Sequence, residues 1–463
     1  MGLSLSVEKF KTTFAVKEGK LTHHSGKKFK LFPFLANTSS EPITDLNKIV
    51  GGYINRIVRR EPETVTMQEF IDTLKKDTNI EPGKETLFEE VIRHMFFDTD
   101  GRLLPINIHT LAQNPCEISS ECRVADYLVD VLGESDILKG SLNKASRKLD
   151  QQSNVLERFA VSKLKTKPMN DNTDGTYYRI VEVFKDVYEE DFDYVLSSKN
   201  RTREYLVTLL EFYYFMYTAQ TCLQLNRFMD GKRDQIIPLY FCLDWEKTSQ
   251  SRRCFGEGWA TMLQPAIKRA FAHAIVLEIL NQTEEENGSV DYIILGDMVT
   301  ESSGVDSEVA SEISKLTDVY RSAILDCPEM MEMERKEIDE DFTAAEIKFL
   351  FDSVNCQFEN TVRSRAYAAY SEKFEAFAYK FLKRRGRSGM MLNVTEELLI
   401  FLTKICIKDE EKMRLNDVFK AFECRGVFLD ELSKEQVMKY YEKLNLIEKK
   451  SDSGDAQYVK RIL

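Results

Sequence analysis

Two carboxylates and a lysine follow an apolar stretch near the middle of the chain, and they are the residues best suited to metal-dependent chemistry. Asp244, Glu246 and Lys247 come directly after the β-rich segment 236–243. Metal-dependent nucleases place a carboxylate two residues before a lysine on a strand, so that both side chains face the same side. Here Glu246 is adjacent to Lys247, and Trp245 takes the position two residues before it. The spacing disfavours a nuclease site, which we keep as an alternative.

The other residue types that commonly carry catalysis form no recognised motif. The chain has no Gly-x-x-x-x-Gly-Lys-Ser/Thr loop for phosphates, no Gly-x-Gly-x-x-Gly, no Gly-x-Ser-x-Gly and no His-Glu-x-x-His. Its nine cysteines and five histidines show no zinc-binding spacing. We therefore expect reduced, buried thiols and ordinary histidines, with no catalytic residues, no metal and no cofactor.

Length and composition predict a multi-domain protein without a membrane span. The 463 residues are too many for one ordinary core, and 43% hydrophobic with 30% charged residues is typical of a globular protein. The net charge of −12 excludes a basic field over the whole protein, so any DNA contact needs a local basic patch. No run of about eighteen apolar residues occurs, and residues 1–8 lack the apolar core of a signal peptide. We expect a cytoplasmic protein.

Hydrophobic periodicity predicts a mainly α fold in three parts. Residues 1–135 are expected to form a small mixed α/β N-terminal region. Residues 136–388 are expected to form a multi-helix body that ends in a long helix and a basic segment. Residues 389–463 are expected to form a C-terminal winged-helix (α+β) domain.

Two long helices are predicted in the body. Residues 201–229 contain no Gly or Pro and are apolar on most sides, which predicts a helix buried on most sides. The second helix is predicted to begin at a capping box formed by Thr343 and Glu346 and to continue to Gly386, because no Gly or Pro interrupts its apolar stripe. That stripe fits either the core of a helix bundle or a seam for a partner, and both interpretations stay open.

The densest basic cluster of the chain lies at the end of this second helix. Cations near a helix C-terminus are favoured by the helix dipole, which is the structural explanation for the cluster. Contact with DNA phosphates is the functional explanation. The candidate DNA-binding residues of this segment are Lys383, Arg384, Arg385 and Arg387.

The C-terminal part has the element order of a winged-helix domain. Its predicted elements are helices 394–407, 415–424 and 433–444 and strands 427–429, 445–450 and 457–463. A capping box formed by Ser433 and Gln436 is expected to begin the third helix. Residues 451–456 are dense in turn formers and separate the last two strands. A helix followed directly by a tight hairpin is typical of the end of a winged helix.

Polar side chains of this domain are suited to DNA. On the third helix the candidates are Gln436, Lys439 and Lys443, because lysine bonds guanine acceptors or phosphates and glutamine can bond adenine bidentately. On the predicted wing the candidates for phosphate contact are Lys449, Lys450, Lys460 and Arg461. Residues 390–463 nevertheless carry 13 Lys and Arg against 14 Asp and Glu, and two aspartates lie at the wing tip. DNA contact and a purely protein-docking role both stay open.

The run 441–459, YEKLNLIEKKSDSGDAQYV, resembles the C-terminal segment of the DptG (DndG) family of DNA phosphorothioation-dependent restriction proteins. The length, acidity and helical body of the chain are compatible with that family. The resemblance implies a bacterial defence system that restricts DNA lacking phosphorothioate modification. It also implies ATPase-like partner subunits of the DptF and DptH type, which would supply the nucleotide-driven work. It supplies no catalytic motif to carry over.

We therefore expect a non-catalytic subunit of such a restriction complex. The helical body would dock the ATPase partners, and the winged helix with the basic segment would contact DNA. The alternatives are a docking scaffold that never contacts DNA and a metal-dependent nuclease that uses carboxylates such as Asp244 and Glu246.

Overall fold

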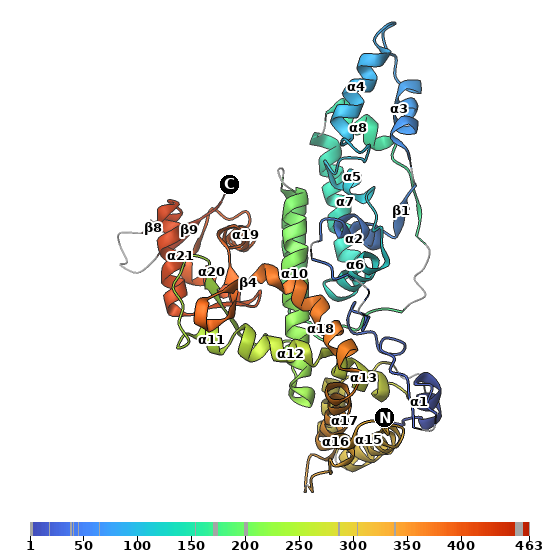
Figure 1. Cartoon of the computed structure of the whole chain (residues 1–463). Helices are drawn as coiled ribbons and strands as arrows, with labels where there is room; N and C mark the ends of the chain where they lie inside the picture. The colour runs from blue at the N-terminus through green and yellow to red at the C-terminus, as the bar shows by residue number, and fades with distance from the viewer. Residues whose placement is uncertain are drawn as a thin grey trace.

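One long helix, α10 (Thr202–Leu225), runs through the middle of the molecule, and the other parts pack around it (Figure 1). All of its residues from Phe212 to Leu225 are buried. The prediction of a helix buried on most sides is therefore confirmed, although the helix ends at Leu225 and a 3-10 turn, η1 (Phe228–Asp230), follows. The prediction of a mainly α protein is also confirmed, since 58% of the structure is helix.

The computed structural model describes residues 3–462 except 18, 38, 40, 45, 64, 153, 170–174, 199–201, 286–287, 303, 338 and 450–456. The helices before α10 are α1 (Val7–Thr13), α2 (Ile49–Val58), α3 (Met67–Lys76), α4 (Glu85–Phe96), α5 (Ile108–Ala112), α6 (Ser119–Val131), α7 (Ser135–Gln152), α8 (Val155–Ser162) and α9 (Lys185–Ser197). Two short strands, β1 (Arg60–Pro62) and β2 (Thr166–Pro168), pair antiparallel among them. None of the helices in the described part of the chain is long and apolar enough to span a bilayer.

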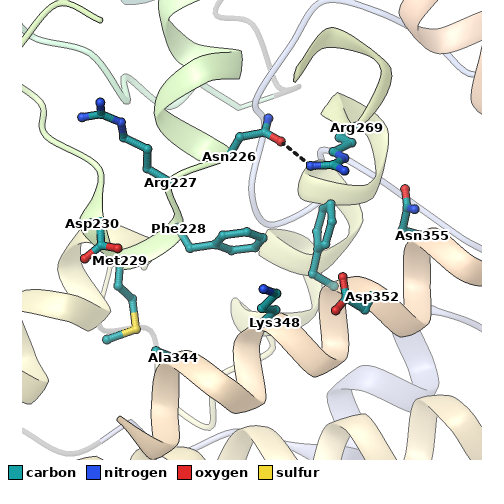
Figure 2. Close-up of a pocket in the computed structure, with 11 residues that line it drawn as sticks. Asn226, Arg227, Phe228, Met229, Asp230, Arg269, Ala344, Lys348, Asp352 and Asn355 are labelled. Atoms are coloured by element: carbon teal, nitrogen blue, oxygen red, sulfur yellow. Dashed lines mark hydrogen bonds between the residues drawn. The ribbon is translucent and has the colours of Figure 1, made fainter. Parts of the chain in front are cut away.

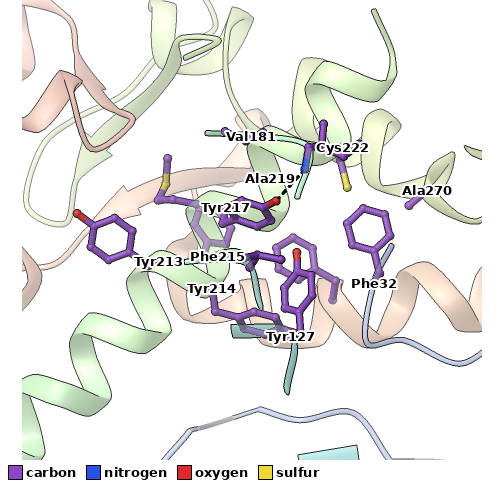
Figure 3. Packing of buried hydrophobic residues seen from close by; sticks show 14 of the residues in the cluster. Phe32, Tyr127, Val181, Tyr213, Tyr214, Phe215, Tyr217, Ala219, Cys222 and Ala270 are labelled. Carbon is purple, nitrogen blue, oxygen red and sulfur yellow. Dashed lines mark hydrogen bonds between the residues drawn. The ribbon is translucent and has the colours of Figure 1, made fainter. Parts of the chain in front are cut away.

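Aromatic side chains form the packing around α10. Figure 3 shows Tyr213, Tyr214 and Tyr217 of this helix together with Tyr127 from α6. The Tyr127 ring meets those of Tyr214 and Tyr217 edge-on, with centroids 6.0 and 5.9 Å apart. The Tyr217 hydroxyl accepts a hydrogen bond from the backbone N–H of Ile180 at 3.1 Å. Edge-on rings fill the core, and this bond satisfies one of its buried polar groups.

The helices after α10 are α11 (Arg253–Gly256), α12 (Gln264–Lys268), α13 (Ala270–Leu280), α14 (Tyr292–Glu301), α15 (Val305–Ser322), α16 (Pro328–Met331), α17 (Phe342–Asn360), α18 (Ser364–Ala378), α19 (Glu396–Ile407), α20 (Leu415–Glu423) and α21 (Glu431–Lys443). A π-helical turn, η2 (Trp259–Leu263), precedes α12, and a 3-10 turn, η3 (Tyr379–Phe381), follows α18.

The predicted helix from Thr343 to Gly386 is wrong, because the chain breaks between α17 and α18. At the break, Thr361 has extended backbone angles. Its hydroxyl donates to the carbonyl of Gln357 at 2.7 Å and accepts from the N–H of Arg363 at 3.3 Å. A threonine side chain that bonds the backbone in this way offers it an alternative to the helical ladder. The break needs no Gly or Pro, so the sequence pattern did not reveal it.

The capping box predicted at Thr343 is also wrong. The helix α17 begins one residue earlier, at Phe342. The carboxylate of Asp306, at the start of α15, accepts from the N–H groups of Phe342 and Thr343, each at 2.8 Å. Glu346 bonds Arg335 instead of closing a box. The cap of this helix therefore comes from a distant segment, which no local pattern could indicate.

A four-stranded sheet joins the body to the C-terminal part. Its strands are β3 (Leu239–Leu243), β4 (Leu382–Arg384), β5 (Met390–Val394) and β7 (Val427–Leu429), in the order β4-β5-β3-β7. The fully buried β3 is parallel to both β5 and β7, whereas β4 pairs antiparallel with β5. The expected boundary between residues 388 and 389 falls in the β4–β5 connection, and the sheet crosses it. The division into three domains stays a prediction.

A second sheet lies wholly within the C-terminal part. Its strands are β6 (Lys412–Arg414), β8 (Ile447–Lys449) and β9 (Gln457–Lys460), in the order β6-β9-β8 with both pairs antiparallel. The predicted strands at 445–450 and 457–463 are thus present in shorter form. The strand β6 lies between α19 and α20 in the chain and had not been predicted.

A buried ion pair ties α9 to the C-terminal part. Arg425, which follows α20, donates to both carboxylate oxygens of Asp191 at 2.7 and 2.6 Å. The Tyr213 hydroxyl donates to the same carboxylate at 2.8 Å. The two charged side chains are 5% and 0% exposed. A fully bonded pair can exist at such depth, whereas a single charge left there would be costly.

We expect Asp191→Ala to destabilise the fold by about 3–5 kcal/mol, because it leaves the Arg425 guanidinium buried without its counter-charge. The measurement is urea unfolding followed by circular dichroism. Glu190→Ala is the matched control, since Glu190 is 69% exposed and pairs with Lys408 at the surface. That control should change stability by at most about 1 kcal/mol. Equal effects of the two substitutions would contradict the assigned role of the pair.

His273 on α13 is a core residue, as expected for an isolated histidine. Its ring stacks on Phe351 with centroids 4.3 Å apart, and its Nδ1 lies 3.1 Å from the Tyr292 hydroxyl. Burial, assisted by the nearby Arg269 cation, lowers the pKa of His273 to about 3. The side chain is therefore neutral in the folded protein at neutral pH.

This neutral histidine predicts a loss of stability in mild acid. Below its ordinary pKa of about 6.5, the unfolded chain binds a proton at His273 that the folded chain excludes until about pH 3. Stability therefore falls as pH falls through this window, by up to about 1.4 kcal/mol per pH unit for one proton. Urea unfolding at several pH values should show a shallower dependence for His273→Gln. The exposed His94 supplies the control His94→Gln, which should keep the wild-type slope.

Candidate nucleic-acid interface

Helix α21 carries the first group of predicted DNA-binding residues, and its position is fixed by apolar packing. Val437 and Tyr441 are fully buried, and the Tyr441 hydroxyl lies 2.5 Å from that of Thr403 on α19. Lys439 and Lys443 point away from this core and are exposed, whereas Gln436 is half-buried. The two lysines make no ion pair or hydrogen bond to any other described residue. They are therefore accessible to a ligand.

The exposed face of α21 is mixed in charge. Glu435 and Glu442 are exposed on the same helix as the two lysines. Lys449 on β8 forms an ion pair with Glu442 at 2.9 Å. One of the predicted wing lysines, Lys449, is therefore paired with a neighbouring carboxylate. Lys450 and the predicted wing tip lie outside the described residues.

The outer face of the three-stranded sheet gathers cations around an aromatic ring. Met413, Val459 and Ile447 are aligned across β6, β9 and β8, and of these Val459 is fully buried. Because side chains alternate along a strand, the residues on either side of each one face the opposite way. The outward-facing residues are Lys412, Arg414, Glu448, Tyr458 and Lys460.

This sheet face is held together by local contacts. The ammonium of Lys412 lies 5.5 Å from the centre of the Tyr458 ring and 2.6 Å from the Glu448 carboxylate. In register, Lys412 is opposite Lys460 and Arg414 is opposite Tyr458. Three cations around one ring and one carboxylate leave the face positively charged. Lys460 was predicted from its place in the last strand, whereas Lys412, Arg414 and Tyr458 were not, and the strand β6 that carries Lys412 and Arg414 is only three residues long.

The remaining wing candidate is partly engaged. Arg461 lies just after β9 and forms an ion pair with Asp409 at 3.1 Å. Both side chains are exposed, so this pair is screened by solvent. Arg461 can exchange Asp409 for another anion at little cost.

The basic segment lies on a strand and a turn, so its prediction as a helix end is wrong. Lys383 and Arg384 belong to β4, and Arg385 and Arg387 lie in the connection to β5. The helix dipole therefore does not explain the cluster. From this strand and turn, the side chains of Lys383 and Arg385 reach residues at the carboxyl end of β3.

Two of these four cations are used inside the structure. Lys383 bonds the Asp244 carboxylate at 2.5 Å, which lowers the pKa of that carboxyl group. Arg385 donates to the carbonyl of Leu243 at 2.6 Å and to the Asn393 side chain at 2.8 Å. Both cations hold the loop after β3. Arg384 and Arg387 are exposed and, within the described residues, their side chains form no ion pair.

The carboxylates that suggested a nuclease are held by structural bonds. Glu246 accepts from the backbone N–H of Leu243 at 2.9 Å and from the Ser433 hydroxyl at 2.9 Å. Arg252 lies 3.4 Å from Glu246 and donates two hydrogen bonds to Asp430, each at 2.6 Å. Among the described residues, no group of three or more His, Cys, Asp or Glu side chains is arranged to hold a metal ion.

These bonds also set the start of α21, and the capping box predicted at Ser433 is wrong. The helix begins at Glu431, and the Asp430 carboxylate accepts from the N–H of Ser433 at 3.0 Å. Burial alone would raise the pKa of Asp430, but the bonds from Arg252 and Ser433 hold it below its usual value. The Ser433 side chain is free to bond Glu246 because it is not the cap. Asp430 thus anchors α21 to the loop that follows β3.

No protein-family model matches this chain, and no curated protein is significantly similar to it.

We expect Arg252→Met to destabilise the protein by about 3 kcal/mol, because it leaves the Glu246 and Asp430 carboxylates with little compensation, at 3% and 10% side-chain exposure. Chemical unfolding measures the loss. The adjacent Arg253→Met is the control, since Arg253 is 55% exposed and pairs with Glu257 on its own helix turn. It should cost about 1 kcal/mol or less. A larger effect at Arg253 would show that the anchor is not at Arg252.

Proposed function

We propose that this protein is a non-catalytic, DNA-contacting subunit whose C-terminal part is a winged-helix domain. The observation that carries the proposal is the element order α19-β6-α20-β7-α21-β8-β9, in which β6, β9 and β8 form one sheet, while β7 pairs with β3 of the body. In a winged helix, the strand between the first two helices pairs with the last strand of the hairpin that follows the third helix. The same pairing joins β6 to β9 here.

Under this proposal the DNA contacts are phosphate contacts from two adjoining elements. Helix α21 offers Lys439 and Lys443, which are exposed and have no described partner. The sheet that follows it offers Lys460, with Lys412 and Arg414 on the same face. Contacts of this kind position a protein on the duplex and make its binding salt-dependent. Gln436 is half-buried, so we expect it to contribute less to DNA binding than the exposed lysines.

We further propose that the chain works within a phosphorothioation-dependent restriction complex. The resemblance of residues 441–459 to the DptG family supports this assignment, and so does a helical body that carries no P-loop motif of its own. ATPase-like subunits of the DptF and DptH type would be its partners. The test is co-purification of the tagged full-length chain with candidate ATPase subunits encoded beside its gene, with an unrelated ATPase as the control.

We expect the triple substitution Lys439→Glu, Lys443→Glu and Lys460→Glu to weaken DNA binding at low salt. It should also reduce the slope of log affinity against log salt by about 2–3, because each lost phosphate contact releases about one counterion fewer. Fluorescence anisotropy with a labelled duplex at several salt concentrations measures both. The control carries the same charge change at Lys76, Lys84 and Lys139, which are exposed in the N-terminal half.

The alternative is a docking scaffold, which the acidic residues on the exposed face of α21 favour. Glu435 and Glu442 would repel phosphates, and Glu442 already engages Lys449. Unchanged DNA affinity in a folded triple variant would exclude this surface as the DNA contact. Loss of partner co-purification in the same variant would then assign the surface to protein docking.

A further inference from the structure

A pocket of about 630 Å³ lies in the body, between the end of α10 and helix α17. Figure 2 shows the residues that line it. The turn after α10 contributes Asn226, Arg227 and Phe228, and α17 contributes Lys348 and Asp352. Its size is in the range of small-molecule sites. None of its lining residues belongs to the C-terminal part, so the pocket is independent of the proposed DNA contacts.

The floor of the pocket is aromatic and held rigidly from behind. The rings of Phe228 and Phe351 meet edge-on, with centroids 5.1 Å apart and planes at 82°. Behind them, His273 stacks on Phe351 and Tyr292 packs against Phe228 at 5.3 Å. In the part of the chain that the structure describes, Nε2 of His273 has no hydrogen-bond partner. Phe351 is only 3% exposed, so a planar ligand would meet the half-buried Phe228 ring, which Phe351 supports edge-on.

Phe228 occupies this platform at the cost of backbone strain. Its φ of 51° lies in the left-handed region, which a bulky aromatic residue rarely adopts. Such conformations cost roughly 1–3 kcal/mol and persist where the surrounding structure over-determines them, often at ligand sites. The packing of the ring against three aromatic neighbours holds it in place. The turn therefore places the Phe228 ring in the pocket lining although its backbone conformation is unfavourable.

The rim combines two carboxylates, Asp352 and Asp230, with several cations, and Asp230 lies on the same side of the pocket as Arg227 (Figure 2). Asp352 is half-buried, and it accepts no hydrogen bond from any described residue. Burial raises the pKa of its carboxyl group, although the Lys348 and Arg269 cations near it act in the opposite direction. Lys348 has no described partner, and Arg269 bonds only the Asn226 side chain, at 3.4 Å. In Figure 2, Arg227 and Asp352 lie at opposite ends of the pocket.

These features restrict the ligand to one chemical class. A purely cationic ligand would be repelled by the cations at positions 227, 269 and 348. A simple anion would leave the aromatic floor and the Asp352 carboxylate unused. The complementary ligand has a planar heteroaromatic ring, a pair of adjacent N–H donors for the Asp352 carboxylate and an anionic group for the cations of the rim. Guanine nucleotides have all three, because guanine presents N1–H and N2–H₂ side by side to a carboxylate, whereas adenine offers one donor beside an acceptor.

We propose that this pocket binds a guanine nucleotide, with the base against Phe228, its N–H edge toward Asp352 and its phosphate toward the cations of the rim. The same chemistry is offered by free guanosine monophosphate and by a 5′-phosphorylated guanine at the end of a DNA strand. Both sources satisfy the same residues.

The test is calorimetric titration of the full-length protein with guanosine monophosphate, adenosine monophosphate and inorganic phosphate. Guanosine monophosphate should bind at least about tenfold more tightly than adenosine monophosphate, and phosphate alone should not bind measurably at about 1 mM. A 5′-phosphorylated trinucleotide that begins with guanine is the fourth arm. Tighter binding of the trinucleotide assigns the pocket to a strand end, and weaker binding assigns it to the free nucleotide.

Two substitutions test the assigned contacts. Asp352→Asn should weaken binding of guanosine monophosphate about tenfold or more and should abolish its advantage over adenosine monophosphate, because an amide cannot accept two adjacent N–H groups. Lys348→Glu should weaken binding of both nucleotides about fivefold or more by reversing a rim charge. Lys268→Glu is the charge-matched control, since Lys268 is exposed on the neighbouring helix α12 but does not line the pocket.

Thermal unfolding of each variant shows whether it is folded. No binding of guanosine monophosphate to the wild-type protein at about 1 mM would overturn the proposal. Equal affinity for the two nucleotides would overturn it as well. So would a folded Asp352→Asn variant with undiminished preference for guanine.

Discussion

The strand β3 depends on partners that arrive much later in the chain, and this constraint shapes the rest of the structure. Its five residues are buried, so each backbone N–H and C=O must find a hydrogen bond inside the protein. The partners are β5 on one side and β7 on the other, both parallel to β3. The body therefore completes its core only when residues 390–429 have folded against it. The orientation of α19, α20 and α21 follows from the strands that flank them.

The charged residues at the carboxyl end of this sheet serve the same constraint. Parallel strands that end together leave polar loops side by side, and here Asp244 and Glu246 meet cations from other segments. Arg252 bonds the largely buried Asp430, and Lys383 bonds the partly exposed Asp244, so that both carboxylates have a cationic partner. The same residue types in an open cleft would suggest catalysis. Their bonding here explains why an acidic pair after a strand is compatible with a structural role.

Local sequence signals gave a sound account of the elements whose stability is local. The run Thr66-Met67-Gln68-Glu69 has the pattern of a capping box, and the box forms, with the Glu69 carboxylate accepting from the Thr66 N–H at 2.9 Å. The uninterrupted apolar run of α10 was equally clear, because a helix that is buried on most sides is apolar on most sides. Each of these features depends on residues within one continuous segment of the chain.

Apart from the break at Thr361, which local hydrogen bonds explain, the failures at helix starts share one physical cause, which is competition from distant partners. The start of α17 is set by Asp306, and Ser433 bonds Glu246 across the sheet while Asp430 caps α21. The basic segment was identified as a cluster, yet its division into engaged and exposed cations depends on carbonyls that follow β3. The sequence contains no local pattern that indicates the pocket. Phe228 and Asp352 are more than a hundred residues apart, and only the fold brings them together.

Helix α10 relates the two proposed sites to each other. Near its first turn, Tyr205 packs on Phe401 of α19 at 5.8 Å and bonds Lys404, so this end is attached to the C-terminal part. At the other end the chain turns through Phe228 into the pocket. Because most of the helix between them is buried and close-packed, we expect it to shift as one unit and not to bend locally. A ligand that orders the turn at Phe228 would therefore act on the C-terminal part only by displacing the whole helix. Binding at the pocket and DNA contact are then expected to be coupled through the position of α10 or not at all.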